Sequence, residues 1–431
     1  MAVMLTYDSN LRLLHRWAIL SFVYFIIAGC MGAFLRLQLF SPVANINYKY
    51  FLHGHSHLAF LGWAFNALFV ALLYAYLPAQ VKRYLVLFGL LQVSVIGMLI
   101  SFPLQGYAAI SITFSTLHIF LSYAFAYQFF KDIRRETFIQ EKHALSMSFI
   151  KWALFFMVLS SLGPFALAAV MAKGLASSPL YGLAIYFYLH FQYDGWFTFA
   201  VFGLFFWLLE SNSITYNSVL GKYFLWMMIS SCLPAYALSA LWIHPPLWVY
   251  MVAALSAIVQ VIALCILIGL FFPIRKNIRQ LLNNQIFNLT TFAGIAFSIK
   301  NILQLLATIP AIADMAYRVR NFNIGYLHLI FLGFVTVFLI AWYAQQGFLH
   351  LNRKLAKVGV SLLMAGFVGS EACIFLQPLF FKYNWGAIPF YHPMLFIFSV
   401  LMPAGISLVV GASFKRNKTH NTAKKQLHIN K

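Results

Sequence analysis

Long apolar segments, separated by short polar connections, run through almost the whole chain. A helix needs roughly 20 apolar residues to cross the hydrocarbon core of a bilayer. Segments of that kind lie near residues 16–40, 52–78, 83–104, 107–130, 148–172, 179–209, 220–242, 247–272, 286–311, 322–345, 356–380 and 389–413. The pattern predicts an all-α integral membrane protein of about twelve transmembrane helices, which form a single membrane domain over residues 1–414.

The composition supports this prediction and excludes an ordinary soluble domain. The 431 residues are 63% hydrophobic and 9% charged, whereas soluble domains carry about 25% charged residues. The N-terminal region enters the first apolar segment without a small-residue cleavage site, so we expect the first helix to be retained. The four cysteines lie far apart in apolar segments, which favours core positions over disulfides or zinc ligands.

The net charge of +21 comes mainly from basic residues in alternate connections and in the tail. If the helices alternate in direction, the basic clusters all fall on one side; they lie at 82–83, 131–142, 275–279, 353–357 and 415–431. Basic loops stay in the cytoplasm. We therefore expect a multi-pass protein of a bacterial-type inner membrane with both termini cytoplasmic. Residues 415–431 then form a basic tail at the membrane surface, and the lipid bilayer, not nucleic acid, is the expected partner.

Three of the predicted helices carry the same signature, H-x4-G-[WF]. It reads HLAFLGW from His57, HFQYDGW from His190 and HLIFLGF from His328. His190 follows His57 by 133 residues and His328 follows His190 by 138, an interval of four predicted helices each time. This spacing predicts three pseudo-repeated arcs of four helices. The glycine lies off the histidine face, and we expect it to let a neighbouring helix approach closely.

An ionisable side chain inside a membrane is costly, and it is usually functional or paired. The three signature histidines lie within about 10 Å of one depth, because a helix rises 1.5 Å per residue. His244, between the seventh and eighth helices, can approach the same layer. Imidazole is a ligand for haem iron and copper. The repeat therefore predicts a haem- and metal-binding layer, with histidines that bond to carbonyl groups or line a transporter pathway as the alternative.

The same motifs resemble subunit I of the haem–copper oxidase superfamily, and in style they are most similar to the nitric oxide reductase large subunit. His57 and His328 resemble the two ligands of the low-spin haem. His190, followed by Asp194, resembles a non-haem metal ligand with an acidic residue four positions later. His244, in WIHPPLW, resembles the histidine pair that follows the seventh helix of the family.

The resemblance implies a fold and an activity. It implies a bis-histidine low-spin haem b between His57 and His328, and copper or non-haem iron near His190 and His244. It also implies reduction of nitric oxide or oxygen in which Asp194 takes part. A cytochrome c-type protein or quinol would supply the electrons, and accessory subunits would be partners.

Three departures from the family pattern concern the second metal site. Tyr326 occupies the position of the first histidine in the family's His-x-His motif. It is either a phenolate ligand of haem iron or a packing residue. His244 stands alone in place of a pair, and Asp194 replaces a tyrosine of the oxygen reductases. The resemblance therefore implies a complete low-spin site and a catalytic site that is degraded or rebuilt. This leaves enzymatic turnover open beside a non-enzymatic role in electron transfer, sensing or metal handling.

Two further histidines, His53 and His55, precede His57 in the sequence HGHSH. His53 and His57 are four residues apart and share a helix face, whereas residues two apart point about 200° from each other. A copper or zinc site at this helix start is one interpretation of the three histidines. By the repeat, His55 occupies the position of Tyr326.

Other charged residues fall inside or at the outer ends of the predicted helices. Arg36, Arg318 and Arg320 lie at outer ends, where they are either clamps for haem propionates or ordinary interfacial arginines. Lys300 and Glu371 lie in mid-helix. We expect these two to pair with each other or to form part of a proton path.

Overall fold

The chain is an all-helical membrane protein. The computed structural model describes residues 2–414, and every element in that range is helical. Within it, eleven helices are long and apolar enough to cross a membrane, one fewer than the sequence predicted. The remaining predicted span, 179–209, is also continuously helical from Pro179 to Ser211, but polar residues interrupt its apolar sequence. The predicted basic tail lies outside the described residues.

Many of the predicted spans are built from two or three helical elements in succession. The first half contains α1 (Ala2–Leu37), α2 (Tyr48–His57), η1 (Leu58–Phe65), α3 (Asn66–Tyr76), η2 (Pro78–Tyr84), α4 (Leu85–Gln105), α5 (Ala109–Ile133), α6 (Thr137–Lys142), α7 (Ala144–Ser160), α8 (Leu162–Ala172), α9 (Pro179–His190), η3 (Phe191–Phe197) and α10 (Thr198–Ser211). The second half contains α11 (Ser218–Cys232), η4 (Pro234–Ile243), α12 (Leu247–Leu281), α13 (Asn284–Leu306), α14 (Pro310–Arg318), α15 (Arg320–His328), η5 (Leu329–Thr336), α16 (Val337–Gln345), α17 (Lys354–Lys382) and α18 (Tyr391–Phe414).

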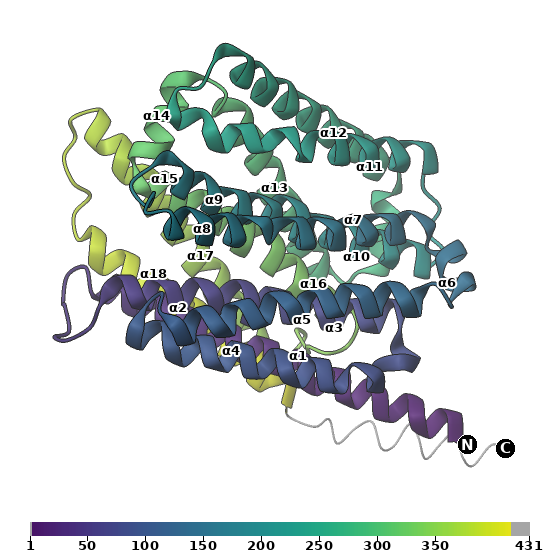
Figure 1. The fold of residues 1–431 in the computed structure, drawn as a ribbon. Helices are drawn as coiled ribbons and strands as arrows, with labels where there is room; N and C mark the ends of the chain where they lie inside the picture. Colours follow the sequence, from purple (N-terminus) through teal and green to yellow (C-terminus); the bar gives the residue numbers. More distant parts are fainter. Residues whose placement is uncertain (1, 415–431) are drawn as a thin grey trace.

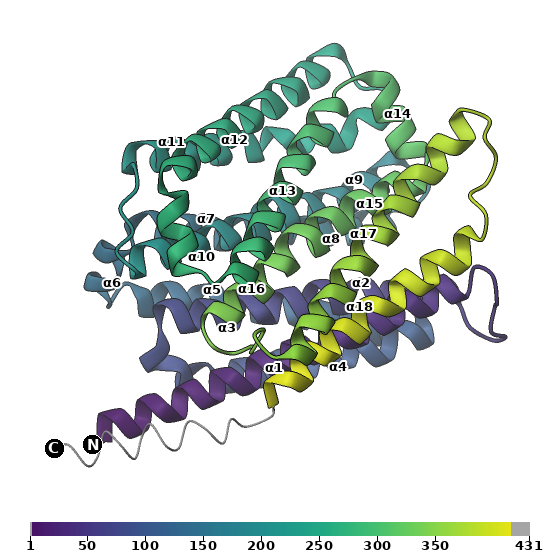
Figure 2. The same ribbon diagram turned by 180° about the vertical axis from the view of Figure 1, so that it is seen from behind.

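Most of the long helices lie in nearly the same direction (Figure 1). Helices α1, α4 and α18 form one side of the bundle, and α11 and α12 form the opposite side. Between them lie α7, α10, α13 and α16, as the view from behind also shows (Figure 2). Helix α18 packs against both α1 and α17, so the last described helix lies beside the first. The N-terminus and α6 lie at one end of the bundle, and α14 lies at the other.

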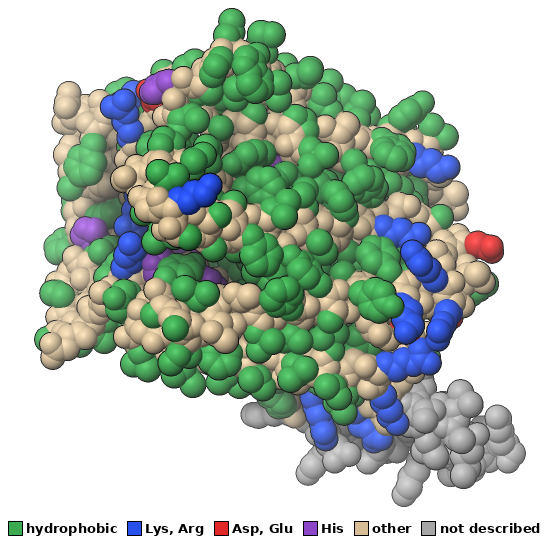
Figure 3. Space-filling model, viewed as in Figure 1, with side chains coloured by type: hydrophobic (Ala, Val, Ile, Leu, Met, Phe, Trp, Pro, Cys, Tyr) green, Lys and Arg blue, Asp and Glu red, His purple; other side chains and the backbone are tan. Residues whose placement is uncertain are grey.

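The surface agrees with a bilayer environment. Hydrophobic side chains cover the length of the helices, while many Lys and Arg side chains gather at the end where α6 lies (Figure 3). Large apolar side chains such as Leu104, Leu247 and Phe272 are more than half exposed. That exposure suits contact with lipid tails, since a soluble monomer rarely exposes extended apolar surface.

The signature glycines occupy close approaches between helices, as expected. A Cβ atom on Gly195 would lie 2.5 Å from Cβ of Phe156 on α7. A Cβ atom on Gly333 would lie 2.7 Å from the Phe367 ring on α17. Real Cβ atoms essentially never approach other heavy atoms so closely. These two glycines therefore set how closely the signature helices pack against their neighbours.

Candidate functional site: a layer of buried histidines

Each signature histidine is the last residue of an α-helix and is followed directly by a π-helix. His57 ends α2 before η1, His190 ends α9 before η3, and His328 ends α15 before η5. π-Helical turns are rare, and they occur frequently at functional sites. The repeated signature therefore has a repeated local structure, which the sequence pattern did not predict.

The three π-helices meet at a cluster of phenylalanine rings. The ring centroids of Phe60 and Phe331 are 4.9 Å apart, and Phe197 lies 5.6 Å from the first and 5.8 Å from the second. Just beyond this cluster, Nε1 of Trp63 donates a hydrogen bond of 2.9 Å to the Thr336 hydroxyl. The cluster fixes the π-helices to one another, and hence the depth of the histidine that precedes each of them.

His55 faces α1 and α15. Its Nδ1 lies 2.9 Å from the carbonyl oxygen of Ala28, and its ring is so near Gly32 that a Cβ there would lie 3.0 Å from Cε1. His55 is also close enough to His328 and Arg36 for their charges to interact. Because the Nδ1 hydrogen is donated to Ala28, Nε2 of His55 keeps its lone pair.

His328 lies next to a buried carboxyl group. Its Nδ1 is 3.5 Å from Oε1 of Glu371 on α17, and the two side chains are 27% and 11% exposed. Neither carboxyl oxygen of Glu371 has a hydrogen-bond partner among the described residues. Arg36 lies within electrostatic range of both Glu371 and His328. Figure 3 shows histidine side chains recessed between helices, at the end of the bundle away from α6.

His57 points away from this pair, toward α4. Its ring stacks on Phe102 with a centroid distance of 4.1 Å, and its Nδ1 lies 2.9 Å from the carbonyl oxygen of His53. The hydroxyl group of Tyr107 is 3.4 Å from its Nε2. The His53 ring also contacts Tyr107. The three histidines of HGHSH thus divide between two sides of α2, and within residues 2–414 no group of three or more His, Cys, Asp or Glu side chains could hold a metal ion.

His190 has no free ring nitrogen. Its Nδ1 is 3.2 Å from Oδ2 of Asp194, and its Nε2 is 2.8 Å from the carbonyl oxygen of Cys232. Asp194 and the Cys232 carbonyl each present an oxygen atom to one ring nitrogen, so neither nitrogen of His190 faces an open site. The ammonium group of Lys300 lies 2.6 Å from Oδ1 of Asp194, and both side chains are 2% exposed. Asp194 therefore forms a buried ion pair with Lys300, with His190 beside it, and within residues 2–414 it is not part of a group of side chains that could hold a metal ion.

Two glutamines form hydrogen bonds with the members of this ion pair. Gln304 donates to Asp194 over 3.2 Å, and Lys300 donates to the side-chain oxygen of Gln260 over 3.2 Å. Lys300 thus pairs with Asp194 and not with Glu371, which corrects one of the two expectations for these mid-helix charges. The sequence interpretation missed both glutamines. The sequence feature that could have identified them is a polar residue within an apolar helix. For Gln304 there is also the spacing of four residues from Lys300, which places both on one helix face.

The remaining candidates lie toward the end of the bundle away from α6. His244 is exposed, and its Nε2 lies 3.6 Å from Asp314, whose carboxylate also lies 3.8 Å from Arg318. Arg320 lies over the Tyr48 ring at 6.0 Å. The phenol ring of Tyr326 is 6.1 Å from that of Tyr193. Of the three predicted arginines, the partly buried Arg36 is the one close to His55 and His328.

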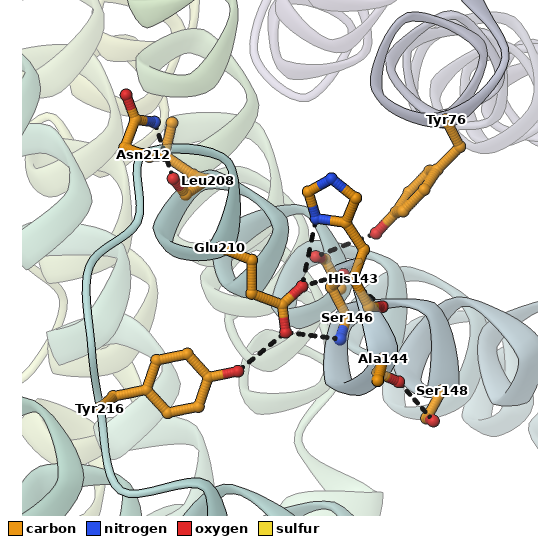
Figure 4. A network of polar contacts seen from close by, with 10 residues as sticks. Tyr76, His143, Ala144, Ser146, Ser148, Leu208, Glu210, Asn212 and Tyr216 are labelled. Atoms are coloured by element: carbon orange, nitrogen blue, oxygen red, sulfur yellow. Dashed lines mark hydrogen bonds and ion pairs between the residues drawn. The ribbon is translucent and has the colours of Figure 1, made fainter. Parts of the chain in front are cut away.

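A second polar network lies at the basic end of the bundle (Figure 4). The carboxylate of Glu210, at the end of α10, accepts hydrogen bonds of 2.6 Å from the Ser146 hydroxyl and 2.8 Å from the Tyr216 hydroxyl. Nδ1 of His143 lies 3.4 Å from the same carboxylate. Burial, together with the Glu210 charge, raises the pKa of Tyr216, so this phenol remains a donor. The network fastens the α10–α11 connection to the start of α7.

The sequence matches no model of a known protein family, and no curated protein is significantly similar to it.

Proposed function

We propose that this chain is a membrane haem protein of the haem–copper oxidase type, in which His55 and His328 hold one b-type haem. A single observation carries the proposal. Nδ1 of each imidazole lies next to an oxygen atom, since Nδ1 of His55 is 2.9 Å from that of Ala28 and Nδ1 of His328 is 3.5 Å, without a hydrogen bond, from Oε1 of Glu371. Metal-bound histidines almost always have such a partner for the second nitrogen, which orients the ring and leaves Nε2 as the ligand.

The surroundings of this pair suit a haem. His55 and His328 come from different helices, and Arg36 is near both of them, where it would pair with an anionic propionate. His328 keeps 27% exposure although Leu329 and Ile330 beside it are buried. Space therefore remains next to the imidazole. A bis-histidine haem, when bound, accepts and donates single electrons.

The proposal modifies the sequence prediction in two respects. It assigns the clamp to His55 in place of His57, because His57 faces Phe102 and Tyr107. It also favours electron transfer over reduction of a gas, because both ring nitrogens of His190 have partners. A cytochrome c-type protein or quinol remains the electron donor that the resemblance implies, with the basic end of the bundle in the cytoplasm.

The test is an absorbance spectrum of the purified protein. After expression with added haem precursor, we expect the reduced-minus-oxidised spectrum to contain one low-spin b-type haem. His55→Ala and His328→Ala should each abolish that signal. His57→Ala and His53→Ala, which alter histidines on the other side of the same helix, should keep it.

Two outcomes would overturn the proposal. One is a purified, folded protein without haem. The other is a low-spin signal that persists in His55→Ala but disappears in His57→Ala, which would return the ligand role to His57.

A second candidate function is a proton-coupled transporter. The observation that favours it is the buried pair of Asp194 and Lys300 with His190 beside it, because ionisable groups inside a membrane domain often mark proton relays. Proton uptake into proteoliposomes by the haem-free protein, lost in Asp194→Asn, would support this function over haem binding.

A further inference from the structure

An apolar groove lies at the surface of the bundle. It has a volume of about 420 Å³ and lies between α10, α12, α13 and the segment formed by η5 and α16. In Figure 2, α13 lies between α12 and α16. The inner wall of the groove consists of core rings such as Phe202 and Phe334, and its rim includes the exposed Ile268 and Ile295. The groove is therefore open to the surface that faces lipid.

Apart from Arg275 and Thr291, the wall of the groove is apolar or has its hydroxyl groups already bonded. The hydroxyl groups of Thr290 and Ser298 in its wall donate to carbonyl groups of their own helix, at 2.9 Å in each case. A ligand with polar groups would have few hydrogen-bond partners in this wall, whereas an acyl chain needs no hydrogen bonds. The volume falls within the range of ligand sites, which is roughly 300–1,000 Å³.

Two arginines stand at the basic end of the groove. The guanidinium group of Arg275 lies 3.8 Å from the centroid of Phe272, and that of Arg279 lies 5.8 Å from the centroid of Phe287. Both phenylalanines line the groove. Both arginines are exposed on the last turns of α12, so their positive charge is available at the mouth.

We propose that this groove binds one anionic phospholipid from the leaflet on the basic side of the membrane. An acyl chain fills the apolar part, and Arg275 and Arg279 bind the phosphate group of the head. Charge complementarity supports this occupant, because basic residues between transmembrane helices on the cytoplasmic side bind anionic head groups. The inference is independent of the haem proposal, since none of its residues lies near His55 or His328 among the contacts described above.

Native mass spectrometry of the detergent-purified full chain tests the proposal. The probes are phosphatidylglycerol and phosphatidylcholine with identical acyl chains. We expect one phosphatidylglycerol to bind with clear preference, by about fivefold for each arginine that contacts the head group. Arg275→Gln with Arg279→Gln should remove the preference. Lys276→Gln, which lies between them but does not line the groove, is the matched control and should keep it.

A second pair of variants tests the apolar part. Gly294 lines the groove, and a Cβ added there meets nothing within 4 Å, so Gly294→Leu introduces a side chain into the space of the groove. We expect it to reduce binding of both lipids at least tenfold. Gly269→Leu, at an equally open glycine that does not line the groove, should leave binding unchanged.

The proposal fails if the wild type binds both lipids equally, or if Lys276→Gln lowers the preference as much as the arginine changes do. It also fails if Gly294→Leu retains full lipid binding. Co-purification of a neutral isoprenoid quinone in the groove, displaced by Gly294→Leu, would assign the groove to a different occupant.

Discussion

At the scale of single residues, hydrogen-bond partners decide what each imidazole can do. His55 and His57 are two positions apart, so they point to opposite sides of one helix. The sequence shows that both histidines are present. Which of them faces His328 depends on how α2 packs against α1. His190 has the same signature as His328, yet Asp194 and the Cys232 carbonyl occupy both of its nitrogens. Two histidines with the same signature therefore differ in whether a ring nitrogen remains available as a metal ligand.

Glu371 provides a test of the proposed ligand pair at this scale. We expect Glu371→Gln to retain the haem and to raise its reduction potential, because an ionised carboxyl group beside His328 would stabilise the more positive oxidised iron. A redox titration of the haem absorbance measures the shift. Glu210→Gln, at the other end of the bundle, is the matched control. An unchanged or lower potential in Glu371→Gln would show that this carboxyl group does not act on the ligand.

Lys300 provides a second test, on stability. Lys300→Met leaves the Asp194 carboxylate buried without its cation, and removing one partner of a buried pair costs about 3–5 kcal/mol. We expect a strongly lowered unfolding temperature in detergent. The double variant Asp194→Asn with Lys300→Met should recover most of the loss, because no unpaired charge remains. A single variant as stable as the wild type would mean that the pair contributes little.

At the scale of elements, the apolar periodicity predicted the helices but not their type. Segments η1, η3 and η5 are π-helices, in which hydrogen bonds close over five residues instead of four. Segments η1 and η5 are as apolar as the α-helices that follow them, whereas η3 contains Gln192 and Asp194, so composition carries no common signal for the wider turn. The partners of mid-helix charges were unpredictable for a related reason. Lys300 and Asp194 lie on different helices, and depth along a helix does not show which neighbour is adjacent.

The signature glycines can be tested at the same scale. In Gly195→Ala the new methyl group would meet Cβ of Phe156, which cannot move away without its backbone. We expect a loss of about 1–3 kcal/mol, the usual cost of overpacking. The matched control is Gly89→Ala on α4, where an added Cβ meets nothing within 4 Å. This change should stabilise the helix by about 0.5–1 kcal/mol. Thermal unfolding measures the change in stability of each variant, and equal changes would exclude a packing role for Gly195.

At the scale of the whole molecule, hydropathy predicted most of the architecture. Eleven of the expected spans are apolar helices of sufficient length. The segment from Pro179 to Ser211 is the exception in composition, because it carries His190, Gln192 and Asp194 in its middle. His190 and Asp194 belong to the buried ion-pair network, and Gln192 donates a hydrogen bond to Ser160 on α7. The span that fails the hydropathy criterion therefore holds a buried polar network, where neighbouring helices replace lipid around it.

The charge distribution predicts the direction of the bundle in the membrane, and this prediction can be tested on one helix. Helix α17 has 29 residues and is about 43 Å long, so it exceeds the roughly 30 Å hydrocarbon core. Lys354 begins it at the basic end, Lys382 ends it at the opposite end, and both are exposed. In a background with all four cysteines replaced by alanine, we expect a membrane-impermeant thiol reagent to label Lys382→Cys in intact cells. Lys354→Cys should react only after the membrane is permeabilised, because basic connections stay in the cytoplasm. The reverse labelling would show that the bundle has the opposite orientation. The arginines of the lipid groove would then lie in the outer leaflet.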